Sequence, residues 1–244
     1  QTKYSNKVIP ITYKILNSKG QFLQPEKTLV LDEKTTSIAL KNQSKKPAIS
    51  LLNSFSAPVI VEFKQSIDDL FAILEFETDF TSVWMTKKKL DYIVLEKIAS
   101  DQPNVENVIS RIYALLINKV HTPSLLAKLL EPLNDNEYFS RLLETTTPDP
   151  KAMQTDIRKY EDLYKGYFKE FSITYFKSFI HNRQYLRENS NYQERQLACA
   201  LIFLNKGTNF LDDFLDIIFN SSNNMSLKAS CLINYCLLYT SDAA

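Results

Sequence analysis

Two histidines are the first residues to consider for metal or acid–base chemistry. His121 lies in Val-His-Thr-Pro and His181 in Ile-His-Asn-Arg, each at the expected end of a helix. A zinc-binding helix of the H-E-x-x-H type needs a second histidine four residues away and a glutamate beside the first, and neither histidine has them. An imidazole at a helix end can instead interact with the last carbonyl groups. We interpret both histidines as capping or surface residues.

Two pairs of neighbouring acids, Asp68-Asp69 and Asp212-Asp213, have the residue types of a general acid and base. Repulsion within such a pair can separate the two pKa values, which acid–base catalysis requires. Each pair, however, stands where an apolar helical pattern begins, and negative charge near a helix N-terminus is favourable. We therefore assign both pairs a structural role.

Nucleophilic and phosphate-binding motifs are also missing from the sequence. Ser56 has neither a neighbouring base nor the glycines of a nucleophile elbow. The three glycines form no phosphate-binding loop, and the three cysteines include no C-x-x-C pair. These residues are Gly20, Gly166, Gly207, Cys199, Cys231 and Cys236. The sequence predicts no catalytic, cofactor-binding or metal-binding residue in this chain.

Aromatic and basic side chains alternate between Tyr160 and Phe179, a composition that also occurs where bases stack beside phosphate contacts. The spacing of these aromatics is helical. Residues 164, 168, 171, 175 and 179 follow one another by three or four positions and so share one face of a helix. This stripe predicts a packed core rather than a ligand platform.

Charge and hydropathy narrow the possible partners. Lys and Arg total 29 against 28 Asp and Glu, so no net field attracts nucleic acid or an anionic membrane. The runs Lys45-Lys46 and Lys87–Lys89 are interpreted as solvated. No apolar run approaches the roughly 20 residues of a membrane-spanning helix. We expect a cytoplasmic, folded protein without nucleic-acid or membrane partners.

The first 64 residues show strand patterns. Four short runs rich in β-branched residues are separated by turn signals, among them Asn17–Gly20 and Asp32–Thr35. The expected strands are Val8–Leu16, Thr28–Leu31, Ser37–Leu40 and Val59–Phe63. Such strands suit part of an antiparallel sandwich.

From Ser66 the hydrophobic period changes from two to 3.6, which places a domain boundary near Gln65. Ser66 and Asp69 have the spacing of a capping box, so we expect a helix to begin there. Further helices are expected over Lys88–Ala99, Asn104–Val120, Ser124–Leu130, Glu137–Glu144, Pro150–Phe179, Tyr192–Leu204 and Leu211–Phe219. Short loops between them indicate antiparallel neighbours in an all-α, irregular solenoid-like array.

Both ends of the sequence are unusual. Gln1 is not preceded by an initiator methionine, as expected of a fragment. Residues Cys236–Ala244 resemble the translation of a sequencing adapter more than protein, so we expect them not to pack.

Several motifs carry a resemblance to a known family. Ile49–Val59 (ISLLNSFSAPV) resembles the S-L-L-x-x-F-S-A-P-V segment of bacterial aminopeptidase N, an alanyl aminopeptidase of the gluzincin zinc metallopeptidases. Ile9–Ile11 with the turn at Asn17–Gly20 is similar to that family's I-P strand and D-N-E-G-type turn. Asp79–Trp84 resembles its N-D-F-S-R-W, with the tryptophan one residue later, and Asn223–Ser226 resembles its N-N-M-T.

The resemblance implies an enzyme of four parts, of which this chain holds two incomplete ones. Residues 1–64 would be the second part of an immunoglobulin-like β domain, residues 65–235 the first part of the helical C-terminal domain, and residues 236–244 the adapter. The family's zinc helix, G-A-M-E-N motif and catalytic tyrosine match no position here. By this likeness the whole enzyme removes N-terminal residues from peptide substrates with zinc, and the helical domain encloses the substrate chamber. The chain's partner would then be its own missing catalytic domain.

A second interpretation comes from another functional class. A protein with a small β domain and a helical array can act as a stand-alone interaction scaffold without enzymatic activity. The two readings differ on whether a zinc helix is encoded upstream. The segment Phe55–Pro58 suits a structural role, and we expect Phe55 to be buried where sheet and helices meet.

Overall fold

The computed structural model describes most of the chain. The described residues are 8–17, 19–33, 35, 37–39, 46–59, 61–118, 122–133, 135–143, 149–181, 197, 200–205, 210–226, 228–229, 231–233 and 236. They form two compact units, Gln1–Ile93 and Val94–Ala244. Among these residues, no helix is both long enough and apolar enough to cross a membrane.

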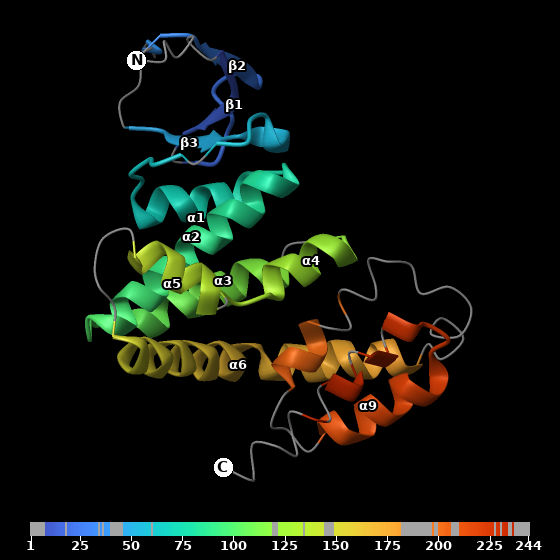
Figure 1. The fold of residues 1–244 in the computed structure, drawn as a ribbon. Coiled ribbons are helices and arrows are strands. Elements are labelled where there is room, and N and C mark those ends of the chain that lie inside the picture. Colours follow the sequence, from blue (N-terminus) through green and yellow to red (C-terminus); the bar gives the residue numbers. More distant parts are fainter. Residues whose placement is uncertain are drawn as a thin grey trace, which may run out of the picture. The chain divides into compact units, whose positions relative to one another are not determined.

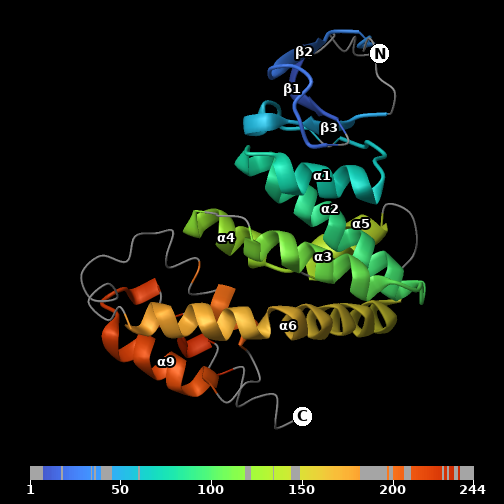
Figure 2. The same ribbon diagram turned by 180° about the vertical axis from the view of Figure 1, so that it is seen from behind.

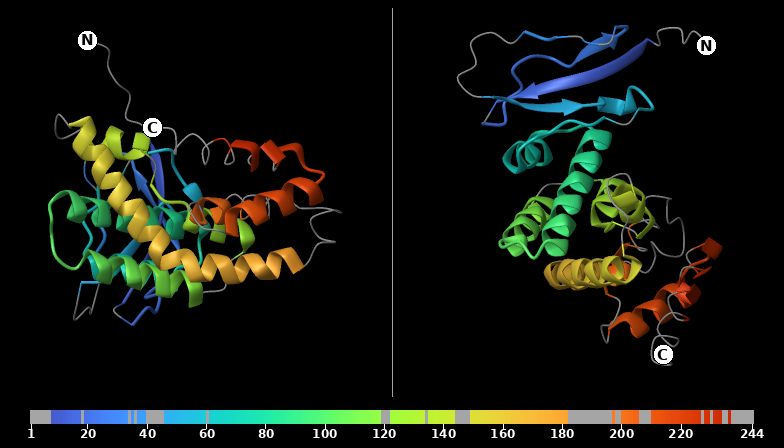
Figure 3. Two further views of the ribbon diagram at one scale, coloured as in Figure 1. Left: turned by 90° about the horizontal axis from the view of Figure 1, so that it is seen from below. Right: turned by 60° about the vertical axis from the view of Figure 1, so that its left-hand side comes forward.

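The first unit begins with a three-stranded antiparallel sheet in the order β2-β1-β3 (Figures 1 and 3). The strands are β1 (Ile9–Leu16), β2 (Lys27–Leu31) and β3 (Ala48–Leu51). Along β1 the side chains of Ile11, Tyr13 and Ile15 are buried and those between them are less so, as alternation across a pleated strand requires. The expected first and second strands are confirmed.

A tight turn leaves β1 where the sequence predicts one. Asn17 Oδ1 accepts hydrogen bonds from the backbone N–H groups of Lys19 and Gln21, at 2.9 and 3.0 Å. Gly20 has a φ of 75°, a region that residues with a Cβ rarely adopt.

Two helices complete the first unit beside β3 (Figure 1). Helix α1 (Ile67–Phe76) begins with the predicted capping box, in which Ser66 Oγ accepts from Asp69 N and the Asp69 carboxylate accepts from Ser66 N. It buries Leu70, Phe71, Ile73 and Leu74. Helix α2 (Phe80–Ala99) follows after three residues and continues into the second unit.

The second unit is helical. Its described helices are α3 (Val105–Asn118), α4 (Pro123–Leu130), α5 (Asp135–Leu143), α6 (Pro150–His181) and α9 (Phe210–Ser221). The long helix α6 packs against α3 and α5, as Figure 2 shows. The predicted layout, an antiparallel β part followed by an all-α part, is confirmed.

Two strand predictions were wrong. Ser37–Ala39 and the described residues of Val59–Phe63 form no strand, whereas Ala48–Leu51 does. Val59 and Val61 pack on the cluster of Ile11, Leu52 and Ala57 without joining the ladder, so their apolar pattern reflects burial alone. Helix α2 also begins at Phe80, eight residues before the expected Lys88.

The domain boundary expected at residue 64 stays a prediction. Contacts between residues divide the chain into two compact units at a different place, after Ile93. Tyr192–Leu204 lies largely outside the described residues, with helix at 197, 200 and 201–204. Of the tail, only Cys236 is described, and its side chain is exposed.

Candidate functional site

The segment that carries the family resemblance contains an unusual turn. We call residues Leu52–Ser56 the 52–56 loop; it includes the short helical turn η1 (Asn53–Phe55). Leu52, Ser54 and Phe55 have φ values of 60°, 55° and 52°. A left-handed conformation costs roughly 1–3 kcal/mol for each residue with a Cβ and persists only where the surroundings impose it. The loop must therefore be held by strong contacts.

Thr12 in β1 supplies three of these contacts. Its backbone N–H donates to Ser56 Oγ at 2.9 Å, and its carbonyl accepts from Leu52 N at 2.9 Å. Its hydroxyl donates to the carbonyl of Asn53 at 2.5 Å. One strand residue thus fixes both ends of the loop.

Glu77, between α1 and α2, holds the loop from the other side. Its side chain is fully buried and accepts hydrogen bonds from Lys14 Nζ at 2.7 Å and Asn53 Nδ2 at 3.1 Å. It also accepts from the backbone N–H groups of Thr78 and Asp79, at 2.7 and 2.9 Å. We call Lys14, Asn53, Glu77, Thr78 and Asp79 the Glu77 network.

The electrostatics of the network favour the ionised carboxylate. Burial by itself would raise the pKa of Glu77, but the hydrogen bonds from Lys14 and from the Asp79 and Thr78 amides hold this pKa below its usual range. Burial likewise would lower the pKa of Lys14, and the contact with Glu77 raises it instead. Glu77 and Lys14 therefore form an ion pair at neutral pH.

Asp79 joins the loop to the start of α2. Its Oδ1 accepts from Ser82 N at 2.9 Å, as the carboxylate of an N-cap residue does. Its Oδ2 accepts from the backbone N–H and the hydroxyl of Ser54, at 2.9 and 3.2 Å. The same side chain therefore caps a helix and stabilises a left-handed residue.

These contacts suit support rather than catalysis. Glu77 already accepts four hydrogen bonds, the usual capacity of a carboxylate, and its lowered pKa makes it a poor general base at neutral pH. Ser56 Oγ accepts a bond from the backbone of Thr12 and acts as part of the turn.

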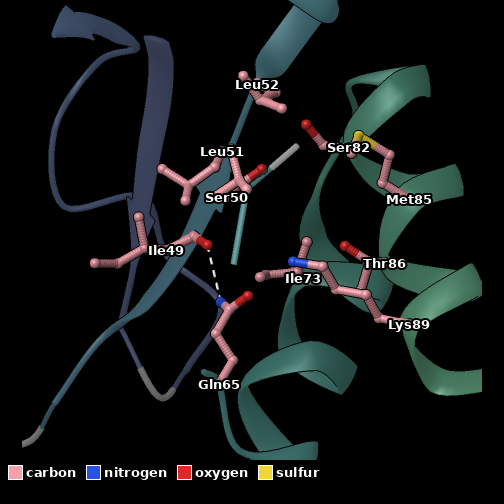
Figure 4. Close-up of a pocket in the computed structure, with 11 residues that line it drawn as sticks. Ile49, Ser50, Leu51, Leu52, Gln65, Ile73, Ser82, Met85, Thr86 and Lys89 are labelled. Atoms are coloured by element: carbon pink, nitrogen blue, oxygen red, sulfur yellow. Dashed lines mark hydrogen bonds between the residues drawn. The ribbon is translucent and has the colours of Figure 1, made fainter. Parts of the chain in front are cut away.

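A small cavity lies beside the loop, between β3 and the two helices (Figure 4). Its volume is about 30 Å³, enough for a water molecule or two but not for a peptide. Ser50, Leu52, Ser82 and Thr86 line part of it, and Gln65 Nε2 closes one end with a hydrogen bond of 2.9 Å to the carbonyl of Ile49.

A second buried ion pair corrects one sequence interpretation. Lys87 was interpreted as part of a solvated run, but its side chain is fully buried and its Nζ lies 2.6 Å from Asp91 Oδ2. The two residues are one helical turn apart on α2, so each can neutralise the other as both leave water. For Lys87 the solvated interpretation was wrong.

The prediction for Phe55 was also wrong. Its side chain is 58% exposed, whereas Leu52 and Asn53 are fully buried. Leu52, Ser54 and Phe55 have left-handed backbone conformations, so their side chains do not alternate as they would in an extended segment. The expectation for Phe55 assumed an extended segment leading to Pro58. The buried junction is formed by Leu52 and Asn53 instead of Phe55.

The acid pairs lie where the sequence predicts. Asp68 and Asp69 are in the first turn of α1, and Asp212 and Asp213 are in the first turn of α9. His121 lies outside the described residues, and His181 ends α6 with a side chain outside the description. Within the described ranges, no three His, Cys, Asp or Glu side chains gather as a metal site would require. The described His, Cys, Asp and Glu residues are therefore not arranged to hold a zinc ion. That the chain contains no catalytic, cofactor-binding or metal-binding residue stays a prediction.

The aromatic stripe is confirmed as core where it is described. Tyr160, Tyr164 and Phe168 on α6 are fully buried, and the rings of Tyr164 and Phe168 stack with centroids 4.6 Å apart. Tyr113 of α3 meets Phe168 edge-on at 5.1 Å, and Tyr164 Oη donates to the carbonyl of Leu129 at 3.0 Å. Phe171 and Tyr175 are half-buried, and the side chain of Phe179 lies outside the description.

Sequence reasoning missed Lys14, Asn53 and Glu77. The available signals were a lysine inside an apolar strand and an acidic stretch, Glu77-Thr78-Asp79, between two helical patterns. Neither signal indicates a partner, because Glu77 bonds to residues 24 and 63 positions away.

Comparison with known proteins gives two findings. Residues 1–64 match a family model described as "Domain of unknown function (DUF3458) Ig-like fold". The structure is similar to the crystal structure of Legionella pneumophila aminopeptidase A in complex with aspartic acid, with a TM-score of 0.75 and 21% sequence identity. A search of curated proteins finds no match.

The structural similarity covers 98% of this chain but only 29% of the Legionella protein. It therefore concerns a section of that larger protein and includes both the sheet and the helices. At this level of identity the similarity establishes the fold. The chain thus has an immunoglobulin-like part in residues 1–64 and, over nearly its whole length, the fold of a section of an aminopeptidase.

Proposed function

We propose that this chain is a non-catalytic section of a zinc-dependent aminopeptidase that removes N-terminal residues from peptides. The observation that carries the proposal is the fold similarity to an aminopeptidase over 98% of the chain. The S-L-L-N-S-F-S-A-P-V segment agrees with it, since its residues form the 52–56 loop and its supports.

In this proposal the chain has a structural role and encloses the substrate, while the zinc-dependent reaction takes place in another part of the polypeptide. The Glu77 network joins the sheet to α1 and α2, and the helical part encloses the substrate chamber. Zinc, when bound in the catalytic domain, activates water for attack on the peptide bond. Among the described residues no three His, Cys, Asp or Glu side chains gather as a metal site would require, and we expect the zinc ligands to lie elsewhere in the polypeptide. We also expect the whole enzyme to be cytoplasmic.

The experiment compares two purified proteins: this chain and the product of the complete reading frame that contains it. Each is assayed for hydrolysis of aminoacyl p-nitroanilides with and without a zinc chelator. We expect the longer protein to hydrolyse the reporters in a chelator-sensitive manner and this chain to be inactive. Hydrolysis by this chain alone would refute the non-catalytic assignment. A complete reading frame without H-E-x-x-H would instead support the stand-alone scaffold.

A further inference from the structure

The cavity beside the 52–56 loop lies within the first unit, between β3 on one side and α1 and α2 on the other (Figure 4). Its volume of about 30 Å³ exceeds the roughly 10–15 Å³ that one water molecule needs. Pockets for organic ligands are larger, about 300 Å³ and above. The size of the cavity therefore admits only a water molecule or an ion of similar size.

Two buried serine hydroxyls line this cavity from opposite sides. Ser50 on β3 and Ser82 on α2 are each 2% exposed. Figure 4 shows their hydroxyl oxygens pointing toward each other across the space between strand and helix. Neither Ser50 Oγ nor Ser82 Oγ has a hydrogen-bond partner among the described residues. Burying a hydroxyl without a partner is unfavourable, so both groups indicate a ligand that hydrogen-bonds to them.

The charges around the cavity favour a neutral ligand. The cationic side chain of Lys89 lines it, and none of the described lining residues is Asp or Glu, so a cation is disfavoured. An anion is disfavoured by the buried carboxylate of Glu77. Burial would raise the pKa of Glu77, and Ser50 is among the groups that lower it, which places Ser50 near this carboxylate. A small neutral molecule that both donates and accepts hydrogen bonds is the remaining class.

We propose that this cavity is a binding site for one internal water molecule, held between Ser50 of β3 and Ser82 of α2. The water accepts a hydrogen bond from one hydroxyl and donates one to the other, so both buried groups gain a partner. Internal waters typically make about three hydrogen bonds. Thr86, which is also buried and lines the cavity one helical turn after Ser82, offers a third hydroxyl.

The water connects the start of α2 to the sheet. Asp79 Oδ1 accepts from the backbone N–H of Ser82, so the cap of the helix leaves the Ser82 side chain available to the cavity. Ser82 is thus held through its backbone by Asp79 and through its hydroxyl, by way of the water, to β3. This role is structural and does not depend on the proposed function.

Oxygen-17 magnetic relaxation dispersion of water tests the site, because it counts internal waters that exchange slowly with the solvent. The 244-residue chain is compared with Ser82→Val, in which two methyl groups replace the hydroxyl and occupy the cavity. We expect one slowly exchanging water fewer in Ser82→Val than in the wild type. The helix cap is retained in the variant, since it uses the backbone N–H of residue 82.

Thr81→Val is the matched control. It removes a hydroxyl from the neighbouring position of α2, which does not line the cavity, and should leave the number of slowly exchanging waters unchanged. Circular dichroism checks that all three proteins are folded. Equal numbers of slowly exchanging waters in the wild type and in a folded Ser82→Val would overturn the water site.

Ser82→Ala provides a second variant in case valine prevents folding. Alanine removes one partner of the water without adding volume, so the water should exchange about fivefold faster, as expected for the loss of one hydrogen bond of ordinary strength. An unchanged exchange rate would contradict the role of Ser82. A crystal structure in which the hydroxyls of Ser50 and Ser82 bond directly to each other would also overturn the proposal.

Discussion

Glu77 and Tyr164 are both fully buried, yet they hold their surroundings by different means. Glu77 accepts directional hydrogen bonds from a strand lysine, a loop asparagine and two backbone N–H groups. Tyr164 stacks on Phe168 within one helix and donates a hydrogen bond to the carbonyl of Leu129. The stability of the Glu77 network depends on charge and hydrogen-bond geometry, and that of the packing around Tyr164 depends mainly on buried apolar surface.

The difference affects how each site should respond to change. A buried carboxylate network is sensitive to pH and to the loss of any one partner. A packed aromatic stripe is indifferent to pH and sensitive to lost volume. Substitutions in the two regions should therefore differ in how the loss of stability depends on pH and on the volume of the side chain removed.

Tyr164→Ala should have the largest effect. Removing a buried aromatic ring costs about 3–5 kcal/mol through lost transfer energy and the remaining cavity. Hydrogen exchange of the α3 and α6 amides, followed by mass spectrometry, should show the loss. Tyr164→Phe removes only the hydroxyl and should cost about 0.5–1.5 kcal/mol. Equal effects of the two variants would contradict a packing role for the ring.

Glu77→Gln should destabilise the first unit by about 1.5–3 kcal/mol, the typical contribution of hydrogen bonds to a charged group. Urea unfolding observed through Trp84, the one tryptophan of the chain, reports on this unit. Glu75→Gln, an exposed neighbour on α1, is the matched control and should stay within about 0.5 kcal/mol.

The effect of Glu77 should also depend on pH. Because its pKa is lowered on folding from an ordinary value of 4.5, its contribution is fully present above that pH and is lost as pH falls through the lower folded value. The wild type should therefore lose stability more steeply than Glu77→Gln below about pH 4.5. Parallel curves for the two proteins would mean that the carboxylate is not stabilised by folding.

Gly20→Ala should cost about 1–2 kcal/mol, since a Cβ at positive φ is strained. The new Cβ would also meet the ring of Phe76. Gly166→Ala on α6 has open space around its Cβ and should stabilise by about 0.5–1 kcal/mol, because alanine favours helix. Thermal unfolding midpoints that fall for Gly20→Ala and rise for Gly166→Ala would confirm that only Gly20 needs to be glycine. An unchanged midpoint for Gly20→Ala would contradict it.

Phe55→Ala and Ser56→Ala should have the smallest effects on stability. The sequence, which predicts a buried Phe55, suggests the larger loss for Phe55→Ala, and the structure predicts the larger loss for Ser56→Ala. Phe55 is exposed, so its truncation should change stability by less than about 0.5 kcal/mol. Ser56→Ala removes the acceptor of the Thr12 N–H and should cost about 1 kcal/mol. Urea unfolding of both variants, observed through Trp84, decides the order. A larger loss for Phe55→Ala would contradict the left-handed turn.

Periodic features were predictable from the sequence. The stripe from Tyr160 to Phe168 repeats at helical spacing, and the capping box at Ser66 and Asp69 needs only four neighbouring residues. The order of a β part followed by helices came from the same kind of signal, whereas the immunoglobulin-like assignment came from the family resemblance of motifs such as Ile49–Val59. Local spacing contains all the information that such features need.

The polar junction was not predictable in the same way. Glu77 finds its partners in β1 and in the 52–56 loop, and no spacing rule connects these segments. The apolar run Val59–Phe63 was misread because burial against a core and membership of a sheet produce the same pattern. The left-handed turn that exposes Phe55 depends on Thr12 and Asp79, which are distant in sequence.

The central claim is that this chain supports an aminopeptidase without containing its chemistry. Its most direct test is the zinc content of the purified 244-residue chain after dialysis against a metal-free buffer, measured by plasma mass spectrometry. We predict well below one zinc per chain, because neither histidine has a ligand partner at zinc-site spacing. One retained zinc per chain would reveal a complete ligand set and contradict the claim.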